Sequence, residues 1–152
     1  MFPGKPRSFT KLHNKMKIDK LLLSTLAGGV AYFILGFLMY GMLFMKFFEA
    51  HSTSSAMKDP MDWWALILGN LIWALFLAYV FSRWASVSTF MGGLKAGAVI
   101  GLLVTLAFDL TIFGTSDMMD LTGTLVDPIV NTVMTGITGG VVGWVLGMGA
   151  SK

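Results

Sequence analysis

The sequence predicts an all-α membrane protein, a bundle of four transmembrane helices, on three observations. First, 55% of its 152 residues are hydrophobic and only 12% are charged, a composition unlike that of ordinary soluble domains. Second, four apolar segments are each long enough to cross a hydrocarbon core, which takes about 20 residues. Third, the basic residues are concentrated in alternate connections. The helices are predicted at about residues 21–45, 60–82, 89–113 and 128–148, within a single domain of residues 21–149.

A basic arm, residues 1–20, precedes the first predicted helix and carries six lysines and arginines. The apolar run after it has about 25 residues, longer than the roughly 7–15 of a signal-peptide core, so we expect this helix to remain in the mature protein. Met16 opens a conventional start of its own. The first fifteen residues are therefore either a disordered extension or the result of a misassigned start.

The second and fourth predicted helices both begin with an Asp-Pro pair. Aspartate is a favoured N-cap residue, and proline is tolerated at the first helical position, where its missing N–H has no partner. Asp59 and Asp127 are therefore predicted to be N-caps, with a ligand or ion role as the alternative, since a carboxylate also suits the positive end of a helix dipole. Asp117 and Asp120 are expected to be ordinary loop charges. Asn70, in the middle of the second helix, is expected to form a hydrogen bond across helices, worth about 1 kcal/mol.

Asp109 lies inside the third predicted helix, about 6 Å below its outer end at 1.5 Å per residue. Asn131 lies at a similar depth in the fourth helix, so the two are predicted to be level neighbours in an antiparallel hairpin. An ionisable residue in a membrane segment is costly unless it is paired or hydrated, which makes Asp109 a candidate functional residue. The structural alternative is that Asp109 reaches interfacial water or pairs with Lys46.

The fourth predicted helix has two distinct faces when its residues are placed 100° apart. One face is polar, and the other carries glycines at the small-xxx-small spacing that lets helices approach closely. Neither face suits lipid, so either this helix is central in the bundle or its glycine face forms an oligomer contact. The third helix offers a matching ladder of glycines. The polar face comprises Thr124, Asp127, Asn131, Thr135 and Thr138, the glycine face Gly136, Gly140, Gly143 and Gly147, and the ladder Gly93, Gly97 and Gly101.

The distribution of charge predicts the orientation of the bundle. Basic residues crowd into the N-terminal arm, the second loop and the C-terminus, whereas every acidic residue except Asp19 lies on the other side. By the positive-inside rule, both termini are predicted to be cytoplasmic. The basic inner surface is expected to attract the anionic lipids of the bilayer. Nucleic acid is not expected as a partner, because the basic cluster lies directly beside a membrane anchor.

The sequence offers little support for a catalytic or metal-binding site. The chain has no cysteine, which excludes disulfides, thiolate metal sites and cysteine nucleophiles. It also lacks HExxH, GxSxG and P-loop motifs. His51 and the methionines near it could be read as a soft copper site, but methionine is abundant throughout the chain and usually serves as packing. We therefore expect no enzyme activity, no cofactor and no metal ion.

Three segments carry a family resemblance: GGVAYFILGFLMYGMLF, LKAGAVIGLLVTLAFDLT and LVDPIVNTVMTGITGGVVGWVLG. Together they resemble small bacterial integral membrane proteins with four predicted helices, which are grouped in domain families of unknown function. The resemblance spans residues 17–148 and implies a multi-pass protein of the bacterial inner membrane. It implies no established activity.

Two functional hypotheses follow from the sequence. The first is a non-enzymatic protein that acts through helix contacts, either as an accessory or assembly subunit with a membrane protein partner or as a homo-oligomer; it rests on the glycine face. The second is a small transporter or ligand-binding membrane module with an outward-facing polar cleft. The residues predicted to build that cleft are Asp109, Asn131, Asp127, Asn70 and Thr135.

Overall fold

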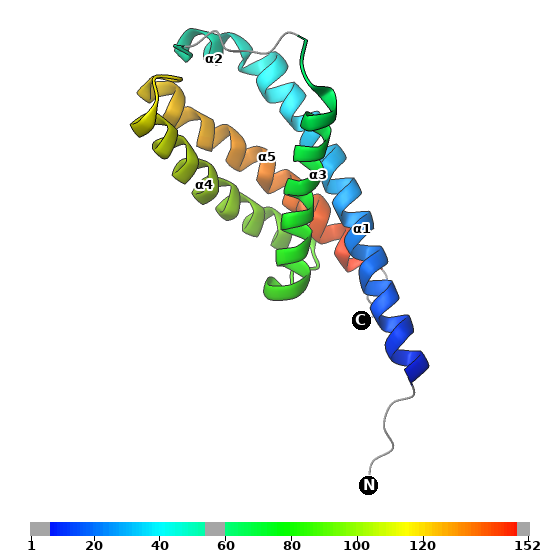
Figure 1. Ribbon diagram of the computed structural model, residues 1–152. Coiled ribbons are helices and arrows are strands. Elements are labelled where there is room, and N and C mark those ends of the chain that lie inside the picture. Colours follow the sequence, from blue (N-terminus) through cyan, green and yellow to red (C-terminus); the bar gives the residue numbers. More distant parts are fainter. Residues whose placement is uncertain (1–6, 54–59, 149–152) are drawn as a thin grey trace.

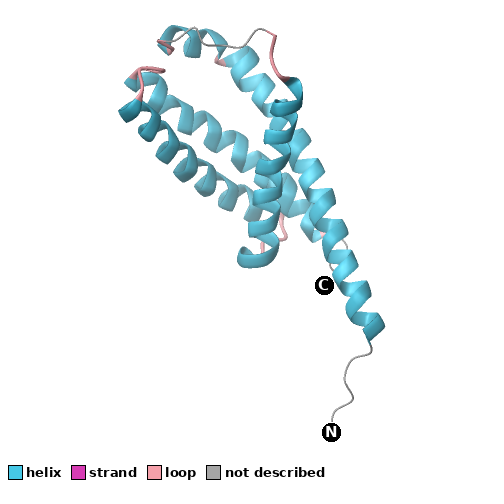
Figure 2. Cartoon of the chain, in the orientation of Figure 1, coloured by secondary structure: helices cyan, strands magenta, loops and turns pink. Residues whose placement is uncertain are grey.

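The computed structural model describes residues 7–53 and 60–148, with side chains from residue 18 onward, as a set of helices (Figures 1 and 2). Within these residues the only β-type pairing is an isolated antiparallel bridge between Ser52 and Met119. Two of the helical elements are short π-helices, η1 and η2, each of which continues an α-helix. The elements in order are α1 (Arg7–Leu38), η1 (Met39–Leu43), α2 (Met45–His51), α3 (Trp63–Val80), η2 (Phe81–Ala85), α4 (Phe90–Thr115) and α5 (Leu121–Gly147).

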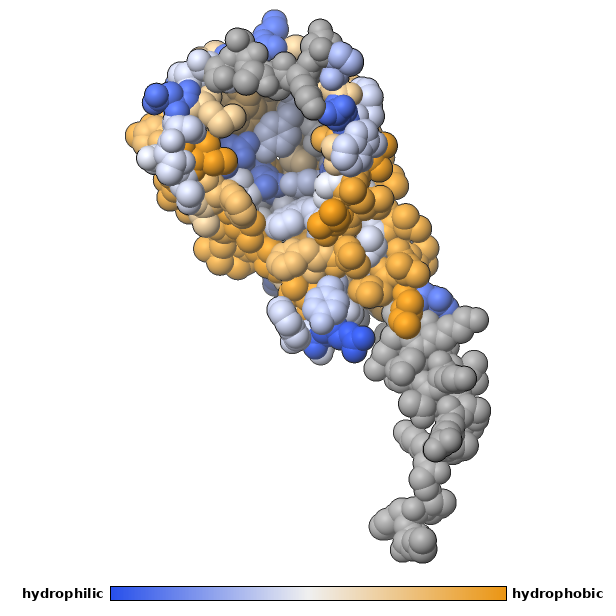
Figure 3. Space-filling model, in the orientation of Figure 1, coloured by the Kyte–Doolittle hydropathy of each residue, from blue (hydrophilic) through white to orange (hydrophobic). Residues whose placement is uncertain are grey.

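Four helical stretches are long and apolar enough to cross a membrane, which confirms the predicted number of spans. The stretches are Ile18–Leu43, Trp63–Ala85, Phe90–Thr115 and Leu121–Gly147. Their exposed side chains are mostly apolar and cover much of the surface in Figure 3, as a lipid-facing surface requires. The last stretch differs from the other three, because 56% of its most apolar window is buried, against 22% or less elsewhere. Helix α5 is therefore the central element.

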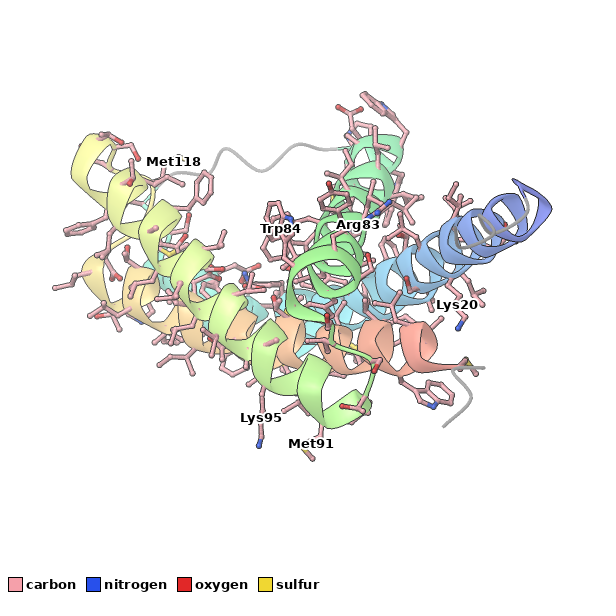
Figure 4. All side chains as sticks on the ribbon, turned by 90° about the horizontal axis from the view of Figure 1, so that it is seen from below. Lys20, Arg83, Trp84, Met91, Lys95 and Met118 are labelled. Atoms are coloured by element: carbon pink, nitrogen blue, oxygen red, sulfur yellow. The ribbon has the colours of Figure 1, made fainter. Side chains whose placement is uncertain are left out.

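The packing around α5 explains this burial. Helices α4 and α5 form an antiparallel hairpin, and α1 contacts both α5 and α3 (Figure 1). We call the end at residues 86–89, between α3 and α4, the inner end, and the end at residues 116–120, between α4 and α5, the outer end; the names follow the predicted orientation. Figure 4, seen from the inner end, shows Lys20 of α1 and Lys95 of α4 pointing away from the bundle.

Glycines bring the α4 and α5 backbones into direct contact. A Cβ atom added to Gly97 would clash with the carbonyl oxygen of Thr135, and one added to Gly143 would lie 2.5 Å from the carbonyl oxygen of Thr89. The remaining glycines of the predicted glycine face also meet residues at or near α4: Gly136 meets Ala98, Gly140 meets the Phe90 ring, and Gly147 meets Ser88. Of the two predicted alternatives, the structure therefore shows the glycine face packed within the chain.

Helix α5 begins seven residues earlier than predicted, and this corrects the assignment of its N-cap. The cap is Asp120, whose side chain accepts a hydrogen bond of 2.8 Å from the Gly123 backbone N–H. Asp127 and Pro128 both lie inside the helix. The prediction that Asp127 caps the helix is wrong, because membrane helices tolerate an internal proline that a soluble-protein rule reads as a start. Asp59, the other predicted cap, lies outside the described residues.

The ends of the first and second predicted helices also differ from the sequence prediction. Helix α1 begins at Arg7, inside the arm of residues 1–20. At its other end the α-helix gives way to η1, breaks at Phe44, where φ is −109° and ψ is 5°, and resumes as the short helix α2. Helix α3 begins at Trp63, directly after Asp62. The first predicted helix is therefore two helical pieces joined by a bend.

Candidate functional site

Three helices carry polar residues at four-residue spacing in the outer half of the bundle. Residues four apart share one face of a helix. Helix α4 contributes Thr105 and Asp109, and α5 contributes Asp127, Asn131 and Thr135. The first transmembrane segment contributes Tyr32 and, eight residues later in η1, Tyr40. We call these seven residues the polar cluster.

The register of the α4–α5 hairpin sets which of these residues are level. Gly97 meets Gly139, and Gly101 meets Thr135, with a distance of 2.6 Å from an added Cβ to the Thr135 Cβ. Moving four residues at a time toward the outer end, in opposite directions along the two helices, brings Thr105 opposite Asn131 and then Asp109 opposite Asp127. The contacts between the glycines of α4 and α5 therefore place these four residues in two polar layers. Thr105 and Asn131 form the inner layer, and Asp109 and Asp127 form the outer layer.

The inner of the two layers is centred on the Asn131 amide. The Tyr32 hydroxyl donates a hydrogen bond of 2.7 Å to Asn131 Oδ1, and the Thr135 hydroxyl donates one of 3.1 Å to the same oxygen. Asn131 Nδ2 in turn donates to the Thr105 hydroxyl. One amide thus links α1, α4 and α5, and both its carbonyl and its amino group have partners.

The outer layer is a pair of carboxyl groups, Asp109 and Asp127, which we call the acid pair. The Tyr40 hydroxyl donates a hydrogen bond of 2.7 Å to Asp127 Oδ1. The Asp109 carboxyl group lies against that of Asp127, and its Oδ2 atom is buried without a hydrogen-bond partner. The predicted alternative partner, Lys46, forms no ion pair with Asp109; the ion pair found among the described residues joins His51 and Asp120. Within the part of the chain that the structure describes, the acid pair therefore has no basic partner.

Figure 3 shows a hollow near the outer end of the molecule, with hydrophilic side chains inside it; apolar side chains lie mainly below it, and hydrophilic side chains flank it toward the outer end. The hollow lies between α3 and the end of α1 on one side and the α4–α5 hairpin on the other, as comparison with Figure 1 shows. The three segments that carry the polar cluster border it. The cluster thus occupies the part of the bundle in which the helices leave this hollow.

The inner half of the bundle is closed by apolar packing. Leu77, Ala78, Phe81 and Val142 form a fully buried group. Val142 lies eleven residues beyond Asn131, hence about 16 Å farther in at 1.5 Å per residue. These side chains separate the polar cluster from the inner end.

Four of the five residues predicted to build the cleft are in the polar cluster, but two details of the prediction are wrong. Asn131 is level with Thr105 and not with Asp109, because the true helix ends shift the register by one turn. Asn70 does not bond across helices: its Nδ2 donates to the Leu66 carbonyl in its own helix, at 2.6 Å. It lines an apolar groove between α1 and α3, and no hydrogen bond joins it to the cluster.

Three members of the cluster were not predicted as site residues. Tyr32 and Tyr40 lie on one side of the first helix together with Gly36, and Thr105 lies four residues before Asp109. That spacing was visible in the sequence, but only the packing of α1 on α5 shows that the tyrosines face Asn131 and Asp127. In a predicted membrane helix, a neutral hydroxyl group is a weaker indication of a functional site than a charged side chain is.

Comparisons with known proteins bear on the same region of the chain. No curated protein and no solved structure matches the sequence. One family model does match, over residues 23–143, a range that contains the whole polar cluster. The chain therefore belongs to the family described as protein of unknown function (DUF1761).

Proposed function

We propose that this protein is a small transporter or ligand-binding membrane module whose outward-facing cleft binds a proton or a small cation at the acid pair. The observation that carries the proposal is the contact between Asp109 and Asp127 inside a membrane-spanning hairpin, with no basic partner among the described residues. Two adjoining carboxylates cannot both stay charged there without a positive charge beside them. A bound proton or cation supplies that charge.

The neighbouring groups narrow the class of ligand. Tyr40 presents a hydroxyl at the acid pair, and the layer below offers further hydroxyl groups and an amide oxygen. Such hard, neutral oxygens suit alkali cations and ammonium, and the two carboxyl groups beside them disfavour anions. The described residues hold no group of three histidine, cysteine or acidic side chains arranged for a metal ion, so they do not favour a transition-metal site. A monovalent cation or a proton fits the cluster best.

The proposal includes an orientation and a location. Lys20, Arg83 and Lys95 lie toward the inner end, whereas Glu49, Asp117 and Asp120 lie toward the outer end. With the positive-inside rule, this distribution supports cytoplasmic termini and a cleft that faces the outside. It also supports contact between the inner end and anionic lipids. The bacterial inner membrane and the absence of enzyme activity remain part of the proposal.

The alternative is an assembly subunit or homo-oligomer that acts through its glycines. It depended on a glycine face of α5 that is free to bind a partner. The glycine face of α5 is covered by α4 and the loop before it in the same chain. A partner would have to bind a different surface. The binding proposal is preferred because a specific observation, the contact between Asp109 and Asp127, favours it.

Thermal unfolding in detergent tests the proposed function. Sodium, potassium or ammonium chloride should raise the Tm of the wild-type protein relative to choline chloride at equal ionic strength, because a ligand that binds only the folded state stabilises it. The rise should shrink at lower pH, where protons compete for the acid pair. Asp109→Asn should abolish it, whereas Asp117→Asn, which removes an exposed loop carboxylate, should not. Equal responses in the wild type and Asp109→Asn, or no response to any of the three cations, would count against the proposal.

A further inference from the structure

The outer end of the bundle is held together by a small set of contacts between α2 and the α4–α5 loop. The Thr53 N–H donates to the Met118 carbonyl at 3.1 Å, and the Asp120 N–H donates to the His51 carbonyl at 3.0 Å. Between these bonds Ser52 lies opposite Met119. The His51 Nδ1 and Asp120 Oδ2 atoms lie 2.6 Å apart as a partly buried ion pair. We call these contacts the latch.

Helix α2 connects the latch to the polar cluster. In Figure 1 it extends from the end of α1 toward the α4–α5 loop, across the outer end of the molecule. Its Phe48 ring lies 5.2 Å from the Tyr40 ring, centroid to centroid, and the Tyr40 hydroxyl bonds to Asp127. Its Phe47 ring lies 4.4 Å from the His51 ring. A short chain of contacts therefore runs from the latch to the acid pair.

Apart from these contacts, α2 is weakly fixed. No residue of α2 or η1 is buried. The two pieces meet at Phe44, where the helix breaks, and η1 is a π-helix, a form that often occurs at functional sites. Segments with few buried apolar contacts open at low free-energy cost. The bend at η1 and Phe44 has the features of a hinge.

We propose that α2 is a lid on the outer end of the cleft, hinged at η1 and Phe44 and held shut by the His51–Asp120 latch. That the lid covers a binding cleft rests on the proposed function; that it is latched does not. In the closed state Phe48 holds Tyr40 on Asp127. Opening removes Phe48 from Tyr40 and exposes the acid pair to the outside.

The latch depends on charge. The hydrogen bond from the Gly123 N–H, followed by the one from His51, lowers the pKa of the Asp120 carboxyl group below its usual range. Asp120 is therefore the charged acceptor of the latch, and a hydrogen bond to a charged acceptor is stronger than one between neutral groups. The other titratable groups of α2, η1, the outer loop and α5 are Lys46, Glu49, Tyr40, Asp117 and Asp127.

Disulfide trapping in this cysteine-free chain of 152 residues tests the latch without any ligand. Ser52 and Met119 form a non-hydrogen-bonded antiparallel pair, whose Cα atoms are typically about 4.5 Å apart and within disulfide range. In proteoliposomes under a mild oxidant, Ser52→Cys/Met119→Cys should cross-link readily. Ser52→Cys/Met118→Cys, whose second side chain points the other way, should not. Adding His51→Gln or Asp120→Asn should slow the cross-link about fivefold at pH 6.

Matched controls separate the latch from general effects of charge and folding. Glu49→Gln and Asp117→Asn also remove one acidic charge each at the outer end and should leave the rate unchanged. Asparagine at position 120 keeps a good N-cap, so α5 should stay folded. Unchanged rates in both latch variants, or equal slowing in the controls, would overturn the latch.

The lid itself is tested by locking it. Closing the Ser52→Cys/Met119→Cys disulfide should slow the release of radiolabelled sodium from the protein at least tenfold, and a reducing agent should restore the rate. If sodium binds in an Asp109-dependent way but is released at the same rate from the locked and reduced forms, the lid is wrong and the proposed function stands. If the latch variants slow cross-linking as expected but no Asp109-dependent binding of a cation or a proton is found, the proposed function and the lid's role in it both fail.

Discussion

At the scale of single residues, the two asparagines of the membrane-spanning segments show how differently one side chain can be used. Asn131 is bonded on both sides of its amide and joins three segments of the chain. Asn70 bonds to the carbonyl of Leu66, one turn back in its own helix, and faces an apolar groove. From the sequence the two looked alike, because a lone polar residue in an apolar helix does not reveal whether a partner faces it.

This contrast gives a matched pair of substitutions. Asn131→Leu should lower the free energy of unfolding by about 1–3 kcal/mol, because it leaves the Tyr32 and Thr105 hydroxyl groups without their partner. Asn70→Leu, an identical change of side chain, should alter it by no more than about 0.5 kcal/mol. Reversible unfolding in mixed detergent micelles measures both. Equal losses in the two variants would show that the Asn131 layer contributes no more than an isolated amide.

At the scale of elements, the sequence predicted four spans correctly and misplaced the start of the last one. The Asp-Pro pair at residues 127 and 128 looked like a helix start, but the cap is Asp120. Because that error moved the helix end by seven residues, depth counted from the ends paired Asp109 with Asn131. The glycine spacing contained the information needed to set the register, yet only the packed hairpin shows which glycines meet.

The hairpin also predicts which glycines tolerate a methyl group. Gly97→Ala and Gly143→Ala should each destabilise the protein by about 1–3 kcal/mol, because the new Cβ would press on backbone atoms of the opposite helix that cannot move aside. Gly140→Ala should cost less, since the atoms nearest to its added Cβ belong to the Phe90 ring, which can rotate. Gly69→Ala and Gly114→Ala are the controls, because nothing lies within 4 Å of a Cβ there. Unfolding in the same micelles ranks the five variants, and a uniform effect would contradict the register.

At the scale of the whole molecule, the two halves of the bundle differ in packing and in polarity. The inner half brings backbones together through glycines and closes with apolar side chains. The outer half holds the same helices around hydroxyl, amide and carboxyl groups and leaves a hollow. The membrane class, the polar face of the last helix and four cleft residues could be predicted from composition and periodicity. The tyrosines and the acid pair could not, since they depend on contacts between residues up to 99 positions apart.

The central claim is that the polar cluster is reached by water from the outside, and cysteine accessibility tests it most directly. Single cysteines at Asn131, Val133 and Val142 in the cysteine-free chain would be treated with a membrane-impermeant thiosulfonate, applied to one side of the membrane at a time. Asn131→Cys should react from the outside only. Val133→Cys, at nearly the same depth but exposed to lipid, and Val142→Cys, in the apolar seal, should not react. A cysteine at position 131 that is unreactive from outside, or that reacts from the inside, would contradict an outward-facing cleft.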